Sequence, residues 1–161
     1  MRLLSIKIIA ILAMGVILST ILATDTTRMI ILAQNSSVAS TPTSKLTEGG
    51  AISVKLEPSP MPVKVNAQTQ SKVSFFEPNT ETIQPHIDYD FIIIDNSTGA
   101  PIFQASNQTG QSGIPIHTAE SIVTIPFTFS NPGDYTIRIP VYGILFNPIP
   151  PESATFAVHV E

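Results

Sequence analysis

The stretch Ile122–Tyr142 reads IVTIPFTFSNPGDYTIRIPVY, and its alternation of apolar and polar residues predicts two β-strands. Successive side chains of a strand point to opposite faces, so every second residue shares a face. Between the two runs, the segment Asn131-Pro132-Gly133-Asp134 predicts a tight turn. The residues expected to face the core are Val123, Ile125, Phe127 and Phe129 before the turn, and Tyr135, Ile137, Ile139 and Val141 after it.

The same pattern returns at the end of the chain, where every second residue from Ala154 to Val160 is apolar. Further strands are predicted at residues 51–57, 63–65, 72–77, 86–95 and 101–106, with a loop at 107–113 and a rigid corner at 147–151. We therefore expect an all-β fold, one antiparallel β-sandwich of about seven to nine strands over residues 51–161. Pro126 and Pro140 cannot donate to a ladder, so each is expected at an edge or a bulge.

The first 33 residues predict export from the cytoplasm. Arg2 and Lys7 precede an uncharged apolar run, Ile8–Ala23, and a shorter apolar patch follows at residues 29–33. We expect one N-terminal apolar helix over this region, serving as a signal peptide or as a membrane anchor. Ile21 and Ile31 are poor matches for the small residue that cleavage requires, so whether the leader is removed stays open. In either case, residues beyond about 34 are expected outside the cytoplasm, secreted or anchored to the cell membrane.

Residues 34–50, QNSSVASTPTSKLTEGG, are rich in Ser, Thr and Gly and predict a flexible linker between the leader and the domain. After Ala33, five basic residues stand against eleven acidic ones. A nucleic-acid-binding protein needs a basic patch, so that class is excluded. The chain has no cysteine, which excludes disulfides, thiolate-bound copper, iron–sulfur clusters and a cysteine nucleophile.

Five segments carry a resemblance to a known group of proteins. They are HIDYDF (His86–Phe91), IPIHT (Ile114–Thr118), VTIPFTF (Val123–Phe129), PGDYTI (Pro132–Ile137) and YGILFNPIPPE (Tyr142–Glu152). In this order they are similar to uncharacterised exported β-sandwich proteins of ammonia-oxidising archaea, and PGDYTIRIPV looks like the turn and strand of immunoglobulin-like modules. The resemblance covers residues 51–161 and implies an immunoglobulin-like sandwich exposed at the cell envelope, with no established activity. Many relatives carry a C-terminal sorting segment that this chain lacks, so any anchor is expected at the N-terminus.

Candidate metal ligands occur in two of these segments. His86, Asp88 and Asp90 alternate along one predicted strand, so their side chains are expected on one face. His117 lies in a segment that could fold back over this strand, with Glu120 nearby in sequence. His86, His117 and a carboxylate, Asp88 first, would then form a site for Cu(II) or Zn(II). A solvated sheet face that binds no cofactor is the simpler interpretation of the same pattern.

Other side chains give weaker signals. His159 is expected to face solvent on the last strand, and calcium could use Asp88, Asp90, Asp95 or Asp134, although the chain has no DxDxDG loop. Asn35, Asn96 and Asn107 each begin an Asn-x-Ser/Thr sequon and are candidate glycosylation sites.

Enzyme signatures are absent from the sequence. The chain contains no GxSxG, HExxH, P-loop or GxGxxG motif, and its single DxD lacks a nucleotide-binding fold around it. We therefore expect a non-catalytic module of the cell envelope that acts in structure or in interaction with an unidentified envelope protein or glycan. The alternative is an extracytoplasmic domain that binds Cu or Zn through His86 and His117.

Overall fold

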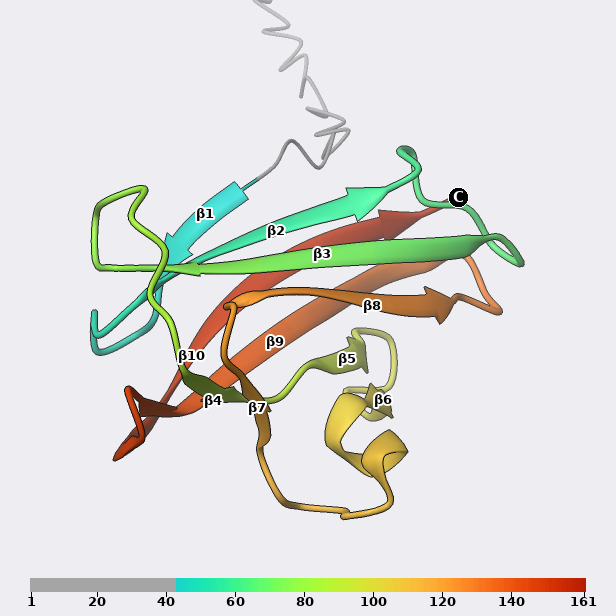
Figure 1. Cartoon of the computed structure of the whole chain (residues 1–161). Helices are drawn as coiled ribbons and strands as arrows, with labels where there is room; N and C mark the ends of the chain where they lie inside the picture. The colour runs from blue at the N-terminus through green and yellow to red at the C-terminus, as the bar shows by residue number, and fades with distance from the viewer. Residues whose placement is uncertain (1–42) are drawn as a thin grey trace, which may run out of the picture. The chain divides into compact units, whose positions relative to one another are not determined.

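Ten β-strands and one short 3₁₀-helix build the part of the chain, residues 43–161, that this computed structural model describes (Figure 1). They are β1 (Thr43–Leu46), β2 (Ser53–Ser59), β3 (Gln68–Phe76), β4 (Ile87–Tyr89), β5 (Ile92–Asp95), β6 (Pro101–Gln104), the 3₁₀-helix η1 (Ala105–Thr109), β7 (Ile116–Thr118), β8 (Ile122–Thr128), β9 (Gly133–Ile144) and β10 (Asn147–Val160). The predicted leader with its apolar helix, and the predicted linker up to residue 42, lie outside the described residues.

The strands form two antiparallel sheets that lie against each other in a sandwich-like arrangement. The smaller sheet has the strand order β1-β2-β3-β8 (Figure 1). Pro126 lies on β8, opposite Gln70 of β3, and β8 is an edge strand of this sheet. The prediction that Pro126 lies at an edge is therefore confirmed, and an edge strand tolerates a residue that has no N–H to donate.

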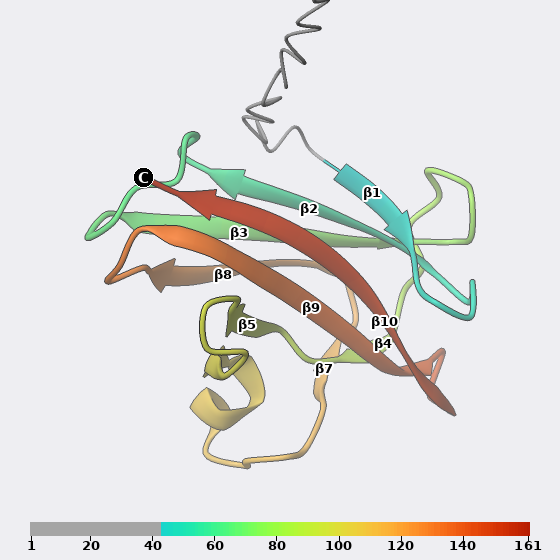
Figure 2. The ribbon, with the colours of Figure 1, turned by 180° about the vertical axis from the view of Figure 1, so that it is seen from behind.

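The larger sheet has six strands and is centred on β9. On one side of β9 runs β10, and Figure 2 shows these two long strands side by side. On the other side of β9, β5 pairs with its first half and β4 with its second half. In the next row of the sheet, β6 pairs with β5, and β7 pairs with β4. The segment Ile114–Thr118 therefore does fold back over the strand that begins after His86.

Pro140 divides one predicted strand into two. The pairs Tyr89↔Val141 and Ile92↔Arg138 place Asp90 opposite Pro140, and the Asp90 N–H donates to the Pro140 carbonyl at 3.0 Å. Proline has no N–H to return this bond, so the ladder is interrupted between β4 and β5. The strand expected over residues 86–95 is thus two short strands, and this break helps raise the count to ten.

The core lies between the sheets and consists of the faces that the alternation predicted. All the predicted core residues from Tyr135 to Val141 and from Ala154 to Val160 are buried, as are Ile125 and Phe129, while Val123 and Phe127 are partly buried against them. Thr124 and Arg138, which alternate with these residues, are exposed. Other large, fully buried side chains that were not named from the sequence join them, among them Phe75 of β3, Phe91 and Ile93.

The predicted linker ends earlier than residue 50. Residues 43–46 form β1, which pairs with β2 from Thr43↔Leu56 to Leu46↔Ser53. In the turn that follows, Thr47 is buried, and its hydroxyl donates to Glu152 Oε2 of β10 at 2.7 Å. The linker boundary predicted at residue 50 is therefore wrong for residues 43–50. These residues are ordered because β1 pairs with β2 and because the Glu152 carboxylate of β10 bonds the turn that follows.

Two smaller predictions also need correction. The expected loop 107–113 begins inside the 3₁₀-helix η1. The expected corner 147–151 is the start of β10, with a register irregularity between Pro148 and Glu152 in place of a corner. The prolines disturb the pairing with β9 there, but the strand continues through them.

Candidate metal site

The two candidate histidines meet at one end of the larger sheet, where β4, β7 and the turn between β9 and β10 come together (Figure 1). Asp88 of β4 lies directly opposite His117 of β7 in the ladder. His86 stands just before β4 with a positive φ of 55°. Its N–H donates to the carbonyl of Ala119, and its carbonyl accepts from the N–H of Leu145, so two other segments hold its backbone in place.

A line of three polar side chains forms the site. His117 Nδ1 lies 2.8 Å from Asp88 Oδ1, and His117 Nε2 lies 3.4 Å from His86 Nδ1. A carboxylate can only accept, so the neutral ring of His117 carries its proton on Nδ1 and directs the lone pair of Nε2 toward His86. The side chains of His117 and Asp88 are 40% and 35% exposed, so the line is open to solvent.

The spacing of the two imidazole nitrogens equals that of two ligands on one tetrahedral metal ion. For metal–nitrogen bonds of roughly 2.0–2.1 Å, the distance between two ligand nitrogens in a tetrahedron is about 3.3–3.4 Å. The 3.4 Å between His86 Nδ1 and His117 Nε2 matches this spacing. In the metal-free protein this contact is a hydrogen bond from His86 Nδ1–H to His117 Nε2, so an ion bound between the rings would replace that proton.

Asp88 is hydrogen-bonded to His117, and its predicted part as a metal ligand stays a prediction. Its carboxylate contacts Nδ1 of His117, whereas Nε2 of the same ring faces His86. For an ion placed between the two rings, Asp88 would therefore lie on the far side of the His117 ring. A carboxylate in this place fixes the tautomer of a ligating histidine and raises its basicity. Within residues 43–161, no group of three or more His, Cys, Asp or Glu side chains is arranged to hold a metal ion. A metal ion between the two rings would thus have two nitrogen ligands from the described residues, His86 Nδ1 and His117 Nε2.

Phe146 covers the histidine pair and was not predicted from the sequence. Its ring centroid lies 4.2 Å from that of His86 and 5.4 Å from that of His117. Phe146 and Leu145 form the two-residue turn between β9 and β10, and both have positive φ, 63° and 51°. Two-residue turns with positive φ at both positions usually have the sequence Asn-Gly or Asp-Gly. The sequence Leu-Phe therefore did not predict a turn here. Side chains with a Cβ are strained there, and strain of this kind is typical of functional sites.

Gly143 makes room for the Asp88 carboxylate. A Cβ on Gly143 would lie 2.5 Å from Asp88 Oδ2, closer than real Cβ contacts allow. Gly143 lies in β9 and is paired directly with Asp88 of the neighbouring strand β4. This glycine was also missed from the sequence, because its role depends on a neighbour 55 positions earlier in the chain.

Asp90 is not part of the site. It is 2% exposed, and its carboxylate accepts hydrogen bonds from Phe91 N–H, Gln104 Nε2, and both the N–H and the hydroxyl of Ser106. It therefore ties the segment around η1 to the strand break at Pro140. Burial raises the pKa of the neighbouring Tyr89 to about 12, and the negative charge of Asp90 adds to the rise, so this phenol is neutral at physiological pH.

The remaining candidates lie away from the histidine pair. His159 is exposed, as predicted, and its Nδ1 lies 2.7 Å from Asp134 Oδ1. Asp95 accepts from the N–H and the hydroxyl of Ser97, which lower its pKa. The four aspartates considered for calcium thus have separate partners, Asp88 with His117 and Asp90 with Ser106 among them.

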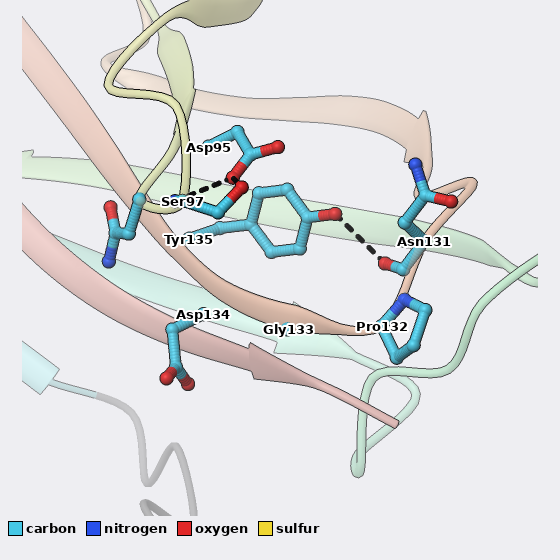
Figure 3. A pocket seen from close by; sticks show the side chains of 8 residues that line it. Asp95, Ser97, Asn131, Pro132, Gly133, Asp134 and Tyr135 are labelled. Carbon is cyan, nitrogen blue, oxygen red and sulfur yellow. Dashed lines mark hydrogen bonds between the residues drawn. The ribbon is translucent and has the colours of Figure 1, made fainter.

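A pocket of about 400 Å³ lies near the turn between β8 and β9 (Figure 3). The hydroxyl of Tyr135 donates to the carbonyl of Asn131 at 2.9 Å, and the carboxylate of Asp95 is bonded to Ser97. Because these groups already satisfy one another, we assign no ligand to the pocket.

The two described sequons are on the surface. Asn96 is exposed, and its Oδ1 accepts from the hydroxyl of Thr136; Asn107 is exposed in η1 and accepts from Ser112. Asn35 lies outside the described residues. Glycosylation of these positions stays a prediction.

No protein-family model matches the chain, and no curated protein matches it either. Among residues 43–161, no helix has the length and apolar character needed to cross a membrane. The site's own chemistry is therefore the main basis for a proposal about function.

Proposed function

We propose that this protein is a non-catalytic β-sandwich module of the cell envelope that binds Cu(II) or Zn(II) through His86 and His117. The observation that carries the metal-binding part is the 3.4 Å between His86 Nδ1 and His117 Nε2, with Asp88 on the far nitrogen of His117. Imidazole suits both metals, and two nitrogens leave further coordination positions open to other ligands.

The envelope location rests on the N-terminal sequence. Arg2 and Lys7 before the apolar run Ile8–Ala23 support export or membrane tethering, and the acidic excess after Ala33 gives no sign of an intracellular nucleic-acid partner. An immunoglobulin-like variety of sandwich is supported by the contact between the Tyr135 hydroxyl and the Asn131 carbonyl, since a tyrosine bonded a few residues back at the start of a strand recurs in that fold.

A second candidate function is interaction without metal. Leu145 and Phe146 are 47% and 68% exposed at the tip of the β9–β10 hairpin. Adjacent exposed apolar side chains at a strained turn suit contact with an envelope protein, or stacking against a glycan. In this case His86 and His117 would serve only to support the turn.

A thermal titration distinguishes the two functions. We expect Zn(II) or Cu(II) at micromolar concentration to raise the melting temperature of the full chain, because an ion bound only by the folded state stabilises it by about 2.7 kcal/mol at a hundred times its Kd. The double variant His86→Ala/His117→Ala should lose this shift. His159→Ala is the matched control, since His159 also pairs with an aspartate but has no second histidine beside it. An equal shift in the double variant would remove the metal-binding proposal.

A further inference from the structure

We propose that two copies of this chain share one metal ion, each contributing His86 and His117 to a four-histidine site. This inference rests on the proposed metal binding. It begins from an incomplete site, because the described residues offer two nitrogens and zinc usually takes four ligands.

The chain itself has no further imidazole or thiolate to complete the site. It contains three histidines and no cysteine, and the third histidine, His159, pairs with Asp134 near the far end of β9 and β10. Residues 1–42 contain no histidine and one acidic residue, Asp25. A second copy is therefore the nearest source of two more imidazoles.

The geometry of the pair suits a two-fold arrangement. A tetrahedron has opposite edges of equal length, and the His86–His117 nitrogen distance of 3.4 Å matches one edge at zinc–nitrogen bond lengths. An ion on a two-fold axis would take one edge from each copy, so both copies would present the same surface to each other.

The surface around the pair supports the same partner. Leu145 and Phe146 are exposed next to the histidines and would become buried between the two hairpin tips. Each copy also brings one Asp88 carboxylate behind its His117. Two such carboxylates balance the double charge of the ion, whereas without the ion they repel each other, so pairing should depend on metal.

The test is zinc titration of the full chain in density-matched detergent, with stoichiometry from calorimetry and mass from sedimentation equilibrium. We expect one zinc ion per two chains, a zinc-dependent shift from monomer to dimer, and reversal by a chelator. His117→Ala should abolish both binding and dimerisation, and His159→Ala should change neither. Phe146→Ser keeps all four imidazoles and should weaken the zinc-bound dimer about tenfold, the loss expected for a partly buried aromatic side chain, with a matching loss of zinc affinity because the second copy completes the site.

The possible failures are distinct. One zinc ion per monomer would overturn the shared site and leave the proposed metal binding intact. A dimer that forms without zinc, or that survives His117→Ala, would overturn the metal-dependent pairing. An unchanged dimer in Phe146→Ser would show that the hairpin tips do not meet. No zinc binding at all would overturn the shared zinc site, and absence of Cu(II) binding in the same titration would overturn the proposed metal binding as well.

Discussion

Gly143 has no side chain, and the Asp88 carboxylate lies within 2.5 Å of the place where its Cβ would be. Gly143→Ala should therefore push Asp88 away from His117 Nδ1. Loss of a carboxylate that orients a ligating histidine typically costs 10–100-fold in metal affinity, and we expect a loss in this range for zinc, measured by calorimetry.

The control for this prediction is the combination with Asp88→Ala. If Gly143 acts by making room for Asp88, Gly143→Ala should lower zinc affinity no further once the carboxylate is gone. Additive losses would mean that the alanine distorts β9 itself.

At the residue scale, the sequence predicted which side chains meet but not what each does. Alternation in a strand placed Asp88 on one face, and an antiparallel return placed His117 beside it. Which nitrogen of His117 faces Asp88 depends on ring orientation, which spacing does not determine. His86 lies just before β4 and contacts His117 because its backbone is in the left-handed conformation. No local sequence pattern predicts that conformation at this position.

At the scale of elements, the turn between β9 and β10 combines strain with exposure of an aromatic ring. The double variant Leu145→Asn/Phe146→Gly would introduce Asn-Gly, the pair preferred in two-residue turns whose residues both have positive φ. We expect the metal-free variant to gain about 1 kcal/mol in free energy of unfolding, because a left-handed conformation costs ordinary residues roughly 1–2 kcal/mol each. Urea denaturation measures the change.

Leu145→Asn alone keeps the Phe146 ring over the imidazoles and should give part of the gain. A double variant less stable than the natural chain would show that the contacts of Phe146 with His86 and His117 outweigh the strain of the turn.

Strand boundaries were harder to predict than strand faces, and Pro140 shows why. The sequence indicates that a proline interrupts a ladder, but not which neighbouring strand loses the bond. In the fold the affected neighbour is Asp90, and the break allows its carboxylate to turn inward and accept hydrogen bonds from Gln104 and Ser106. Asp90 was expected beside His86 because the alternation was read as one continuous strand.

At the scale of the whole domain, the core followed directly from period-two alternation, whereas the N-terminal boundary did not. Residues 43–50 contain few large apolar groups, so composition favours a linker. Their order comes from distant partners. Glu152 accepts from Thr47 and from the N–H of Ala51, and Lys45 donates to the carbonyl of Thr155 at 2.6 Å. Bonds between residues about 100 positions apart leave no local trace in a sequence.

The Thr47–Glu152 hydrogen bond joins the turn after β1 of the smaller sheet to β10 of the larger sheet, and a double-mutant cycle should show its contribution. Thr47 is 3% exposed, and hydrogen bonds to charged groups contribute roughly 1.5–3 kcal/mol. We expect Thr47→Val and Glu152→Gln each to lower the free energy of unfolding by about 1–2 kcal/mol, and the double variant to lose about 1 kcal/mol less than the sum.

The matched control is the partly exposed pair Lys55 and Glu57 on β2, whose charged atoms lie 3.1 Å apart, with Lys72 as a second partner of Glu57. Surface pairs of this kind couple by about 0–1 kcal/mol, so the cycle Lys55→Met with Glu57→Gln should show a smaller coupling energy. Equal coupling in the two cycles, or strict additivity at Thr47 and Glu152, would mean that the turn after β1 packs against β10 without depending on this carboxylate. The domain would then tolerate a boundary near residue 51 after all.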